Sequence, residues 1–271
     1  MFHGKKIVVV MPAYNAAQTI ERTVAEIPMD LVDEVVVTDD ASHDSTVQVA
    51  RRLGLRTLVH EQNRGYGANQ KTCYTEALRL GADVVVMLHP DYQYTPKLLP
   101  SVIGLCVDGP FDVVLGSRVL GGRALAGGMP RYKYVANRVL TAIQNWLCAA
   151  KLSEYHTGYR AFTREVLEAL PLLENSDDFV FDNQMLAQIL LAGFEIGEVS
   201  CPAAYFEEAS SINFQRSLRY GLGVLWTSLQ AFAHRKGLAR VTIFDPAGRR
   251  LDPSAPPQGA AVASTGSFVH G

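Results

Sequence analysis

Chemically active side chains follow five short apolar runs of this 271-residue chain, one set after each run. The runs occupy residues 7–10, 34–38, 56–60, 83–88 and 112–116, and the sets are PAYN, DDASHD, EQNRGYG, HPDYQY and GSR. Carboxylates, amides, a glycine-rich loop and a guanidinium are suited to a nucleotide, a diphosphate and a divalent metal. Because an open α/β sheet binds ligands at the carboxyl ends of its strands, the ordered set predicts one site for such a ligand.

Two aspartates are the main candidates for ligand binding. Asp39 ends a buried run, where its carboxylate can accept a hydrogen bond from a base N–H or a ribose hydroxyl. Its neighbour Asp40 fits a turn role at least as well as ligand binding. Asp91 lies just past the fourth run, with Gln93 beside it. A hard cation on a diphosphate needs one or two protein carboxylates, so we predict a metal ion at Asp91 rather than a simple turn after Pro90.

A loop that opens a helix supplies a further group, and its residues include Asn63, Gly65 and Gly67. Glycines let backbone N–H groups approach an anion, and the N-terminus of a helix carries partial positive charge. We expect this loop to contact the diphosphate. A GxG turn is common, so the pattern carries weight only together with its neighbours.

The apolar runs predict the elements that hold these groups. They are hydrophobic almost throughout rather than alternating, which requires cover on both faces and indicates a mostly parallel, Rossmann-like α/β sheet with helices on both faces. A strand-like run at 196–201 closes the domain near Tyr205. We assign residues 1–210 to one domain, 211–240 to an amphipathic helical extension and 241–271, rich in Pro, Gly, Ala and Ser, to a disordered tail.

Bulk composition narrows the function classes. Hydrophobic residues make up 48% of the chain and charged residues 19%, which allows a sizeable core. The formal net charge of −2 argues against nucleic-acid binding, which usually needs a clear basic excess. The four cysteines form no CxxC pair, and no stretch approaches the ~18–20 apolar residues of a membrane span. We therefore expect a cytoplasmic protein.

The extension carries apolar residues at helical spacing, flanked by arginines and lysines. The apolar stripe comprises Leu218, Leu222, Leu225, Trp226, Leu229 and Phe232. Such a stripe fits the interface of a membrane, at its inner face, near a lipid acceptor. A helix with such a stripe more often packs on the rest of the protein or on a second copy in a homo-oligomer. Membrane binding and protein packing therefore both stay open.

The ordered set PAYN, DDASHDST, NRGYGA, HPDYQ, GSR and TGYRAF resembles glycosyltransferase family 2, of the GT-A fold. Within it, the likeness is greatest to polyprenyl-phosphate (dolichyl-phosphate) sugar synthases, and it covers residues 5 to about 205. The resemblance implies an inverting transfer of a sugar from a nucleotide diphosphate donor, with Mg²⁺ or Mn²⁺ as the cofactor. UDP and GDP donors are both compatible with it.

The resemblance also implies donor-side roles for individual residues. The nucleoside-binding positions are Pro12, Ala13, Tyr14, Asp39 and Asp40. Asp91 and Gln93 match the second acidic residue and the Gln of the DxDxQ stretch that holds the metal. His89 stands at the first Asp of that stretch, which is a departure. A neutral imidazole can ligate Mn²⁺, although His89 fits a packing role as well.

On the acceptor side, the resemblance implies that Ser117 and Arg118 help to hold the acceptor phosphate. Thr157 to Arg160 match an SGFR-like motif, and Asp182, after Phe181, matches an acidic position of the family.

The acceptor itself stays open between two chemistries. A hydroxyl acceptor needs a base, for which Asp182 is the candidate. A phosphate acceptor needs cationic clamps, for which Arg118, Arg131 and Lys133 are the candidates. Arg160 fits either acceptor binding or an internal ion pair. We favour a polyprenyl phosphate over a glycan or small-molecule hydroxyl, and a catalytically silent nucleotide-sugar-binding scaffold is the alternative from another class.

Overall fold

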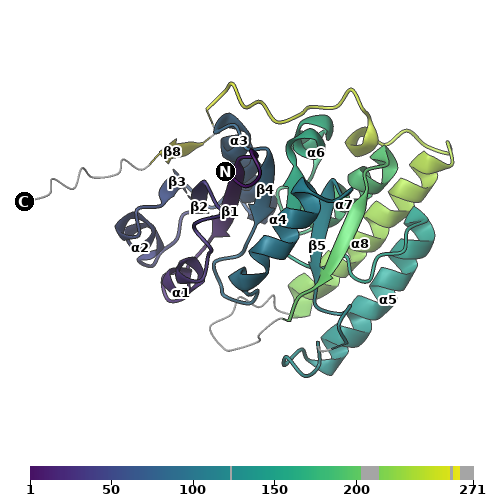
Figure 1. The fold of residues 1–271 in the computed structure, drawn as a ribbon. Helices are drawn as coiled ribbons and strands as arrows, with labels where there is room; N and C mark the ends of the chain where they lie inside the picture. Colours follow the sequence, from purple (N-terminus) through teal and green to yellow (C-terminus); the bar gives the residue numbers. More distant parts are fainter. Residues whose placement is uncertain (123, 203–213, 257–258, 263–271) are drawn as a thin grey trace, which may run out of the picture.

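The computed structural model describes residues 1–122, 124–202, 214–256 and 259–262, which form an eight-stranded sheet (Figure 1). The strands lie side by side in the order β7-β5-β6-β4-β1-β2-β3-β8. Their bounds are β1 Ile7–Ala13, β2 Glu34–Asp39, β3 Arg56–His60, β4 Val84–Met87, β5 Val113–Ser117, β6 Arg160–Thr163, β7 Ile196–Ser200 and β8 Ala260–Val262.

The strand directions bring the predicted site residues to one edge of the sheet. β1 pairs in parallel with β2 and β4, and β2 pairs in parallel with β3. β6 runs antiparallel between β4 and β5, so β5 points the same way as β4, and β7 is parallel to β5. The carboxyl ends of β1 to β5 therefore face the same way. The predicted mostly parallel α/β sheet is confirmed.

Helices cover both faces of the sheet because the buried strands alternate their side chains between two cores. On β1, Ile7 and Val9 pack in the core under α1, α2 and α4, whereas Val8 and Val10 pack in the core under α3, α6 and α7. The helix bounds are α1 Ile20–Ala25, α2 Thr46–Arg52, α3 Tyr66–Arg79, α4 Leu99–Val107, α5 Arg131–Cys148, α6 Arg164–Ala169, α7 Phe181–Ala192 and α8 Phe214–Arg235. Short 3₁₀ helices span Pro96–Leu98, Leu172–Glu174 and Thr242–Phe244.

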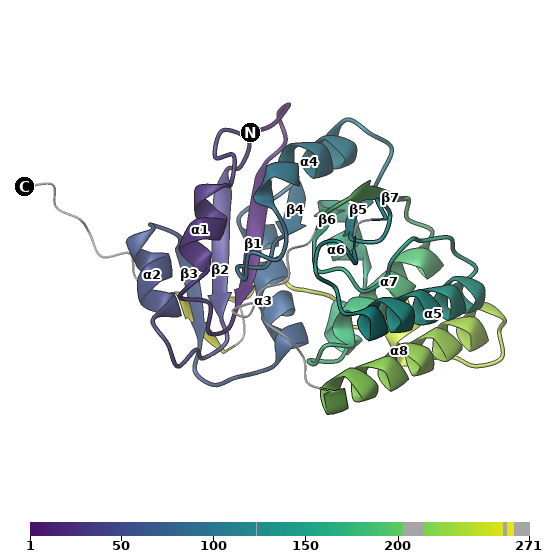
Figure 2. The ribbon, with the colours of Figure 1, turned by 90° about the horizontal axis from the view of Figure 1, so that it is seen from below.

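The amphipathic extension, α8, packs against α5 and α7, and Figure 2 shows α5 and α8 side by side. Its buried side chains are small: Val224, Thr227, Ser228 and Ala231. The larger residues of the predicted stripe face outward, and Leu218, Leu222, Trp226 and Leu229 are 48–63% exposed. The face of α8 that packs on α5 and α7 is therefore the one with small residues, which let the helices approach closely. The apolar stripe lies on the other face.

The chain after α8 differs from the predicted disorder. Phe244 is buried against Ala187 and Ala231, and Leu251 joins the core under α3 and α7. β8 then pairs antiparallel with β3. Pro, Gly, Ala and Ser dominate the composition of this segment and obscured the few large apolar residues that anchor it.

Two strands were not predicted from the sequence. β6 lies within TGYRAF, where a buried charged residue interrupts the apolar pattern, and β8 is only three residues long. The expected end of the domain near Tyr205 and the boundary at residue 210 lie outside the described residues.

Candidate active site

Asp39 is the last residue of β2, and its two carboxylate oxygens have different surroundings. The residue is 1% exposed, and its Oδ2 accepts a hydrogen bond from the Ser42 N–H at 2.9 Å. Its Oδ1 is buried without a hydrogen-bond partner among the described residues. Burial raises the pKa of this carboxyl group. A buried acceptor of this kind is costly unless a ligand donates to it.

Both carboxylate oxygens of the next residue, Asp40, have hydrogen-bond partners. Its Oδ1 lies 2.7 Å from His60 Nδ1 and accepts from the Arg64 N–H at 2.9 Å, while its Oδ2 accepts from the Gly65 N–H at 3.0 Å. Asn63 also donates to the Asp40 backbone carbonyl. The Asp40 carboxylate therefore anchors the loop after β3, which is the turn role rather than the nucleotide-binding role.

The glycines of this loop are required by close packing. A Cβ on Gly65 would lie 2.5 Å from the Asp177 carbonyl oxygen, and one on Gly67 would lie 2.4 Å from the Ser176 carbonyl oxygen. The Gly67 N–H donates to Asp177 O at 2.8 Å. The amides of Gly65 and Gly67 are thus bonded within the protein, and they do not form the anion cradle expected from the sequence.

The end of β1 lies beside Asp39. Pro12 and Ala13 are buried on β1, and Ala13 stands in register with Asp39. Tyr14, the next residue, is 50% exposed, and its ring packs edge-on against the His43 ring at 6.4 Å. The predicted nucleoside-binding residues Tyr14 and Asp39 are therefore neighbours across two adjacent strands.

After β4, Asp91 lies half-buried in a turn, where its Oδ1 accepts the Gln93 N–H at 3.1 Å. His89 is held by Tyr66, whose hydroxyl lies 3.1 Å from His89 Nε2 and donates to Asp182 Oδ2 at 3.0 Å. The pKa of Tyr66 is raised by burial and by the charge of Asp182, so the phenol keeps its proton. Since that proton goes to Asp182, His89 Nε2 is the donor in its contact with Tyr66, and in a neutral imidazole this arrangement leaves the lone pair on Nδ1.

This donor set fits a metal ion that is bound together with a nucleotide. No group of three His, Cys, Asp or Glu residues that could hold a metal by itself occurs in the described part of the chain. Magnesium in nucleotide sites usually takes one or two carboxylates and completes its shell with phosphate oxygens and waters. Asp91 supplies one such carboxylate at the edge of the sheet, and the His89 Nδ1 lone pair is compatible with Mn²⁺.

Gly158 connects this turn to the TGYR motif. A Cβ on Gly158 would lie 2.4 Å from His89 Nε2, so only glycine permits the two segments to approach this closely. The Gly158 N–H also donates to the Tyr94 hydroxyl at 3.0 Å. The glycine of the motif thus brings the donor and acceptor sides together.

Asp182 and Arg160 are joined in a buried hydrogen-bond network. Asp182 was the candidate base and Arg160 a candidate acceptor-binding residue. Gln70 Nε2 donates to Asp182 Oδ1 at 2.9 Å, and Arg160 Nη1 lies 3.3 Å from the same oxygen. Arg160 is fully buried and also donates to the backbone carbonyls of Thr157 and Tyr155. Arg160 therefore has the internal ion-pair role. Asp182, with both oxygens engaged, is not positioned as a free general base.

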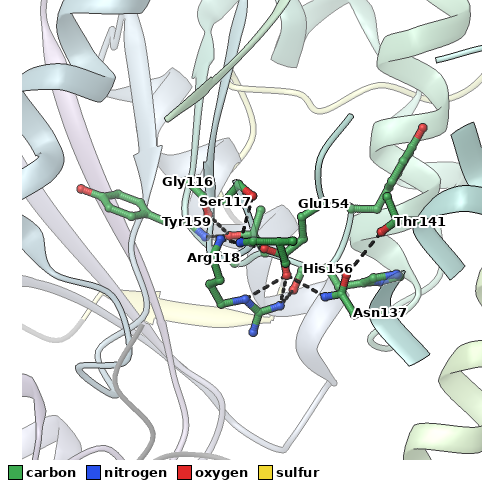
Figure 3. Close-up of polar contacts among 12 residues, drawn as sticks. Gly116, Ser117, Arg118, Asn137, Thr141, Glu154, His156 and Tyr159 are labelled. Carbon is green, nitrogen blue, oxygen red and sulfur yellow. Dashed lines mark hydrogen bonds and ion pairs between the residues drawn. The ribbon is translucent and has the colours of Figure 1, made fainter. Parts of the chain in front are cut away.

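Arg118 also differs from its expected role as a phosphate clamp. Figure 3 shows its guanidinium directed at the Glu154 carboxylate, where Nε donates to Oε1 at 2.9 Å and Nη2 forms an ion pair. The Arg118 backbone N–H donates to Oε2 at 2.8 Å. Burial by itself would raise the pKa of Glu154, but the Arg118 charge and hydrogen bonds hold it below its ordinary value. The positive charge of Arg118 is thus balanced inside the protein.

Two other predicted acceptor-side residues are also buried. Ser117 is fully buried, and its Oγ accepts hydrogen bonds from Ser153 Oγ and the Leu120 N–H. Thr157 donates through its hydroxyl to the Gly116 carbonyl. The side-chain oxygens of Ser117 and Thr157 are therefore engaged in hydrogen bonds within the protein. The two remaining cationic candidates, Arg131 and Lys133, begin α5 and are exposed and half-buried, respectively.

Three further residues of the candidate site were not predicted from the sequence. Glu154 neutralises Arg118 and accepts from Asn137 Nδ2 at 2.8 Å. Tyr66 links His89 to Asp182, and His156 places its Nδ1 2.9 Å from the Tyr220 hydroxyl. Glu154 and His156 directly precede TGYR in the sequence, and Tyr66 lies within NRGYG. That adjacency was the available signal.

Comparisons with known proteins show the family of this chain. The model of glycosyl transferase family 2 matches residues 8–170. A dolichyl-phosphate hexose transferase of Haloferax volcanii is 32% identical over 201 residues, which are 72% of this chain and 82% of that protein. A polyprenol monophosphomannose synthase of Mycolicibacterium smegmatis is 27% identical over 203 residues, 72% of this chain and 76% of that protein. The chain therefore belongs to glycosyl transferase family 2.

Solved structures share the fold. Glucosyl-3-phosphoglycerate synthase from Mycobacterium tuberculosis, in complex with phosphoglyceric acid, superposes with a TM-score of 0.67 and 23% identity over 89% of this chain and 83% of that chain. The same enzyme with Mn²⁺, UDP and phosphoglyceric acid gives a TM-score of 0.64 at 22% identity over 89% of this chain and 81% of that chain. The expected GT-A fold is thus confirmed.

Proposed function

We propose that this protein transfers a hexose from a nucleotide diphosphate sugar to a polyprenyl phosphate. The observation that carries the donor half is the buried, unpartnered Oδ1 of Asp39 beside the exposed Tyr14 ring. A nucleoside would donate to that oxygen and lie against that ring. Asp91 follows β4, which lies on the other side of β1 from β2, and it would face the diphosphate. A divalent ion bound there supplies positive charge to the leaving group.

The acceptor half rests on how the charges are distributed. Asp182 has its oxygens engaged by Tyr66, Gln70 and Arg160, which disfavours a base for a hydroxyl acceptor. A phosphate acceptor is already ionised and needs no base. Arg131 and Lys133 form no ion pair among the described residues and are the candidate clamps for it. The curated relatives named above carry lipid-phosphate acceptors in their names, which supports the same choice.

The proposal includes a location. A polyprenyl phosphate is held by a membrane, and the nucleotide sugar is a solute. We therefore place the protein in the cytoplasm, peripherally at the inner face of the membrane.

The test is a transfer assay with two acceptors that differ in one group. The full chain is incubated with Mn²⁺ and labelled UDP- or GDP-hexoses, together with a polyprenyl phosphate or the polyprenol of the same length. Transfer to the phosphate alone is the expected result. Transfer to the polyprenol, or to a glycan hydroxyl only, would overturn the acceptor assignment.

The assay also separates an enzyme from a nucleotide-sugar-binding scaffold. Metal-stimulated hydrolysis of the donor is measured in parallel with the wild type and Asp91→Ala. A donor that raises the melting temperature of the protein but is neither transferred nor hydrolysed would overturn the enzymatic proposal, since a ligand that binds only the folded state stabilises it.

A further inference from the structure

Helices α5 and α8 together present an apolar surface to the outside of the molecule. On α5, Tyr132, Val135, Val139 and Trp146 are 53–74% exposed at spacings of three, four and seven residues, and on α8 Leu218, Leu222, Trp226 and Leu229 are 48–63% exposed. The Trp146 ring on α5 stacks near the Phe232 ring on α8, with centroids 6.3 Å apart. The two stripes are thus parts of one surface, which we call the α5/α8 face. Contiguous apolar surface of this kind marks an interaction site.

The charges around this face have one sign. Residues 131–151 and 214–240 contain nine of the 25 Lys and Arg residues of the chain and none of its 27 Asp and Glu residues. Arg131, Arg138, Arg219, Arg235 and Lys236 are exposed. None of the ion pairs found among the described residues involves a side chain of these two segments. The whole chain has a net charge of −2, so this basic surface is a local feature.

The charge pattern favours a lipid surface over a second copy of the chain. A two-fold dimer pairs a surface with itself, so the arginines of one copy would face the arginines of the other without any acidic residue on either face. An anionic membrane supplies the opposite charge. It also accommodates exposed tryptophan, tyrosine and leucine at the level of its headgroups.

The inner side of the same helix pair reaches the acceptor side of the site. Asn137, on α5, donates to Glu154, and Tyr220, on α8, lies within hydrogen-bond distance of both His156 Nδ1 and Asn183 Nδ2. One side of each helix therefore contacts the residues next to TGYR while the other side is the α5/α8 face. None of the described helices is long and apolar enough to cross a membrane.

We propose that the α5/α8 face docks on a membrane surface that carries anionic lipid, with its apolar residues in the interface and its basic residues against the headgroups. This inference rests on the proposed function in that it explains how a lipid-linked phosphate would reach the acceptor side of the site. It is a statement about binding and can be tested without any transfer reaction.

The test is vesicle flotation of the full chain without nucleotide sugar or acceptor. We expect binding to phosphatidylglycerol-containing vesicles, much weaker binding to pure phosphatidylcholine vesicles, and a decrease when NaCl is raised to screen the charges. Trp226→Glu, at a side chain 63% exposed, should lower the partition coefficient about tenfold, because it removes an interfacial anchor and adds a repulsive charge. Leu222→Glu, at 61% exposure, should act in the same direction.

The matched control is Met29→Glu, since Met29 is 56% exposed between α1 and β2, at the opposite end of the molecule (Figures 1 and 2). It should bind vesicles like the wild type, and the melting temperatures of all variants should agree. Unchanged binding of Trp226→Glu would overturn the proposal. So would a wild-type dimer in sedimentation velocity that Trp226→Glu dissociates, because the face would then bind a second copy.

Failure of docking can be told apart from failure of the proposed function. A short, water-soluble polyprenyl phosphate should be used equally well by the wild type and Trp226→Glu, whereas a vesicle-embedded acceptor should be used at least about tenfold more slowly by the variant. Flotation without any transfer would leave docking standing and overturn the acceptor. Transfer to the soluble acceptor without flotation would do the reverse.

Discussion

The two sides of the candidate site treat their charges differently. On the donor side, Asp39 keeps an unpartnered buried oxygen and Asp91 is half-buried with one weak internal hydrogen bond. On the acceptor side, Arg118 is paired with Glu154, and Arg160 with Asp182. Unpaired buried groups are costly, so they persist where a ligand uses them, whereas paired ions hold a shape. We therefore propose that Asp39 and Asp91 bind ligands, whereas the paired residues of the acceptor side hold the structure.

The largest effect should follow from Asp91→Ala. If this carboxylate holds the metal against the diphosphate, its loss should lower the initial rate of sugar transfer roughly a hundredfold or more at saturating Mn²⁺, as removal of other groups that stabilise transition-state charge does. Stability should change little because Asp91 has few partners. Asp30→Ala, at an exposed position, is the control. An unchanged transfer rate would remove Asp91 from the site.

Among the effects on stability, the largest should follow from Glu154→Gln. Glu154 is fully buried and balances Arg118, so the variant leaves a guanidinium without its counter-charge. The free energy of unfolding in urea should fall by about 3–5 kcal/mol. In Glu168→Gln, which breaks the exposed pair with Arg164, the loss should stay within about 0.5 kcal/mol. Equal losses in both variants would contradict the distinction between buried and exposed pairs.

His156 should make the free energy of unfolding depend on pH under acidic conditions. Burial lowers the pKa of His156 to about 4 from 6.5, so between these values the unfolded chain takes up a proton that the folded chain does not. Stability should therefore decrease as pH falls from 6.5 towards 4, by an amount on the order of 2 kcal/mol. The slope of unfolding free energy against pH should be shallower in His156→Asn. Equal slopes in the wild type and His156→Asn would refute the prediction.

The smallest effect should be a gain in stability. Burial raises the pKa of Asp39, so its charged form destabilises the fold above that pKa, and the penalty disappears as pH falls below 3.8. At neutral pH, Asp39→Asn should raise the free energy of unfolding by about 1 kcal/mol, while nucleotide binding, followed by calorimetry, weakens. Asp40→Asn is the matched comparison and should be destabilising, because Asp40 accepts from Arg64 and Gly65. If both variants changed the free energy of unfolding in the same direction, the proposed difference between Asp39 and Asp40 would be wrong.

Much of the fold could be predicted because its signal is local. The apolar runs that became β1 to β5 are continuous in sequence, and each is followed by polar residues, so their parallel order and their shared edge follow from general rules. β6 could not be predicted, because Arg160 interrupts its apolar pattern and has its charge balanced by Asp182, which lies 22 residues away in the sequence. The docked segment around Phe244 and Leu251 depends in the same way on distant partners.

The strand order brings the predicted residues to one edge of the sheet, but the sequence could not predict their hydrogen-bond partners. Asp39 and Asp40 are identical side chains on consecutive residues, and no local pattern distinguishes the one that is left unpartnered from the one that binds His60 and the loop after β3. Likewise, helical spacing identified the apolar stripe of α8 but not its direction. The small residues Thr227, Ser228 and Ala231 take the buried side, because α5 and α7 approach α8 closely there.

The sequence by itself determined the parallel sheet, the polar strand ends and the family, since each depends on the types and order of residues close together in the chain. Only the tertiary structure decided which charged groups are paired, which helix face is outside and that the segment after α8 is docked. Those properties depend on groups from different elements meeting at hydrogen-bond or van der Waals distance. We therefore propose that pairing distinguishes the ligand-binding residues of this protein from the structural ones.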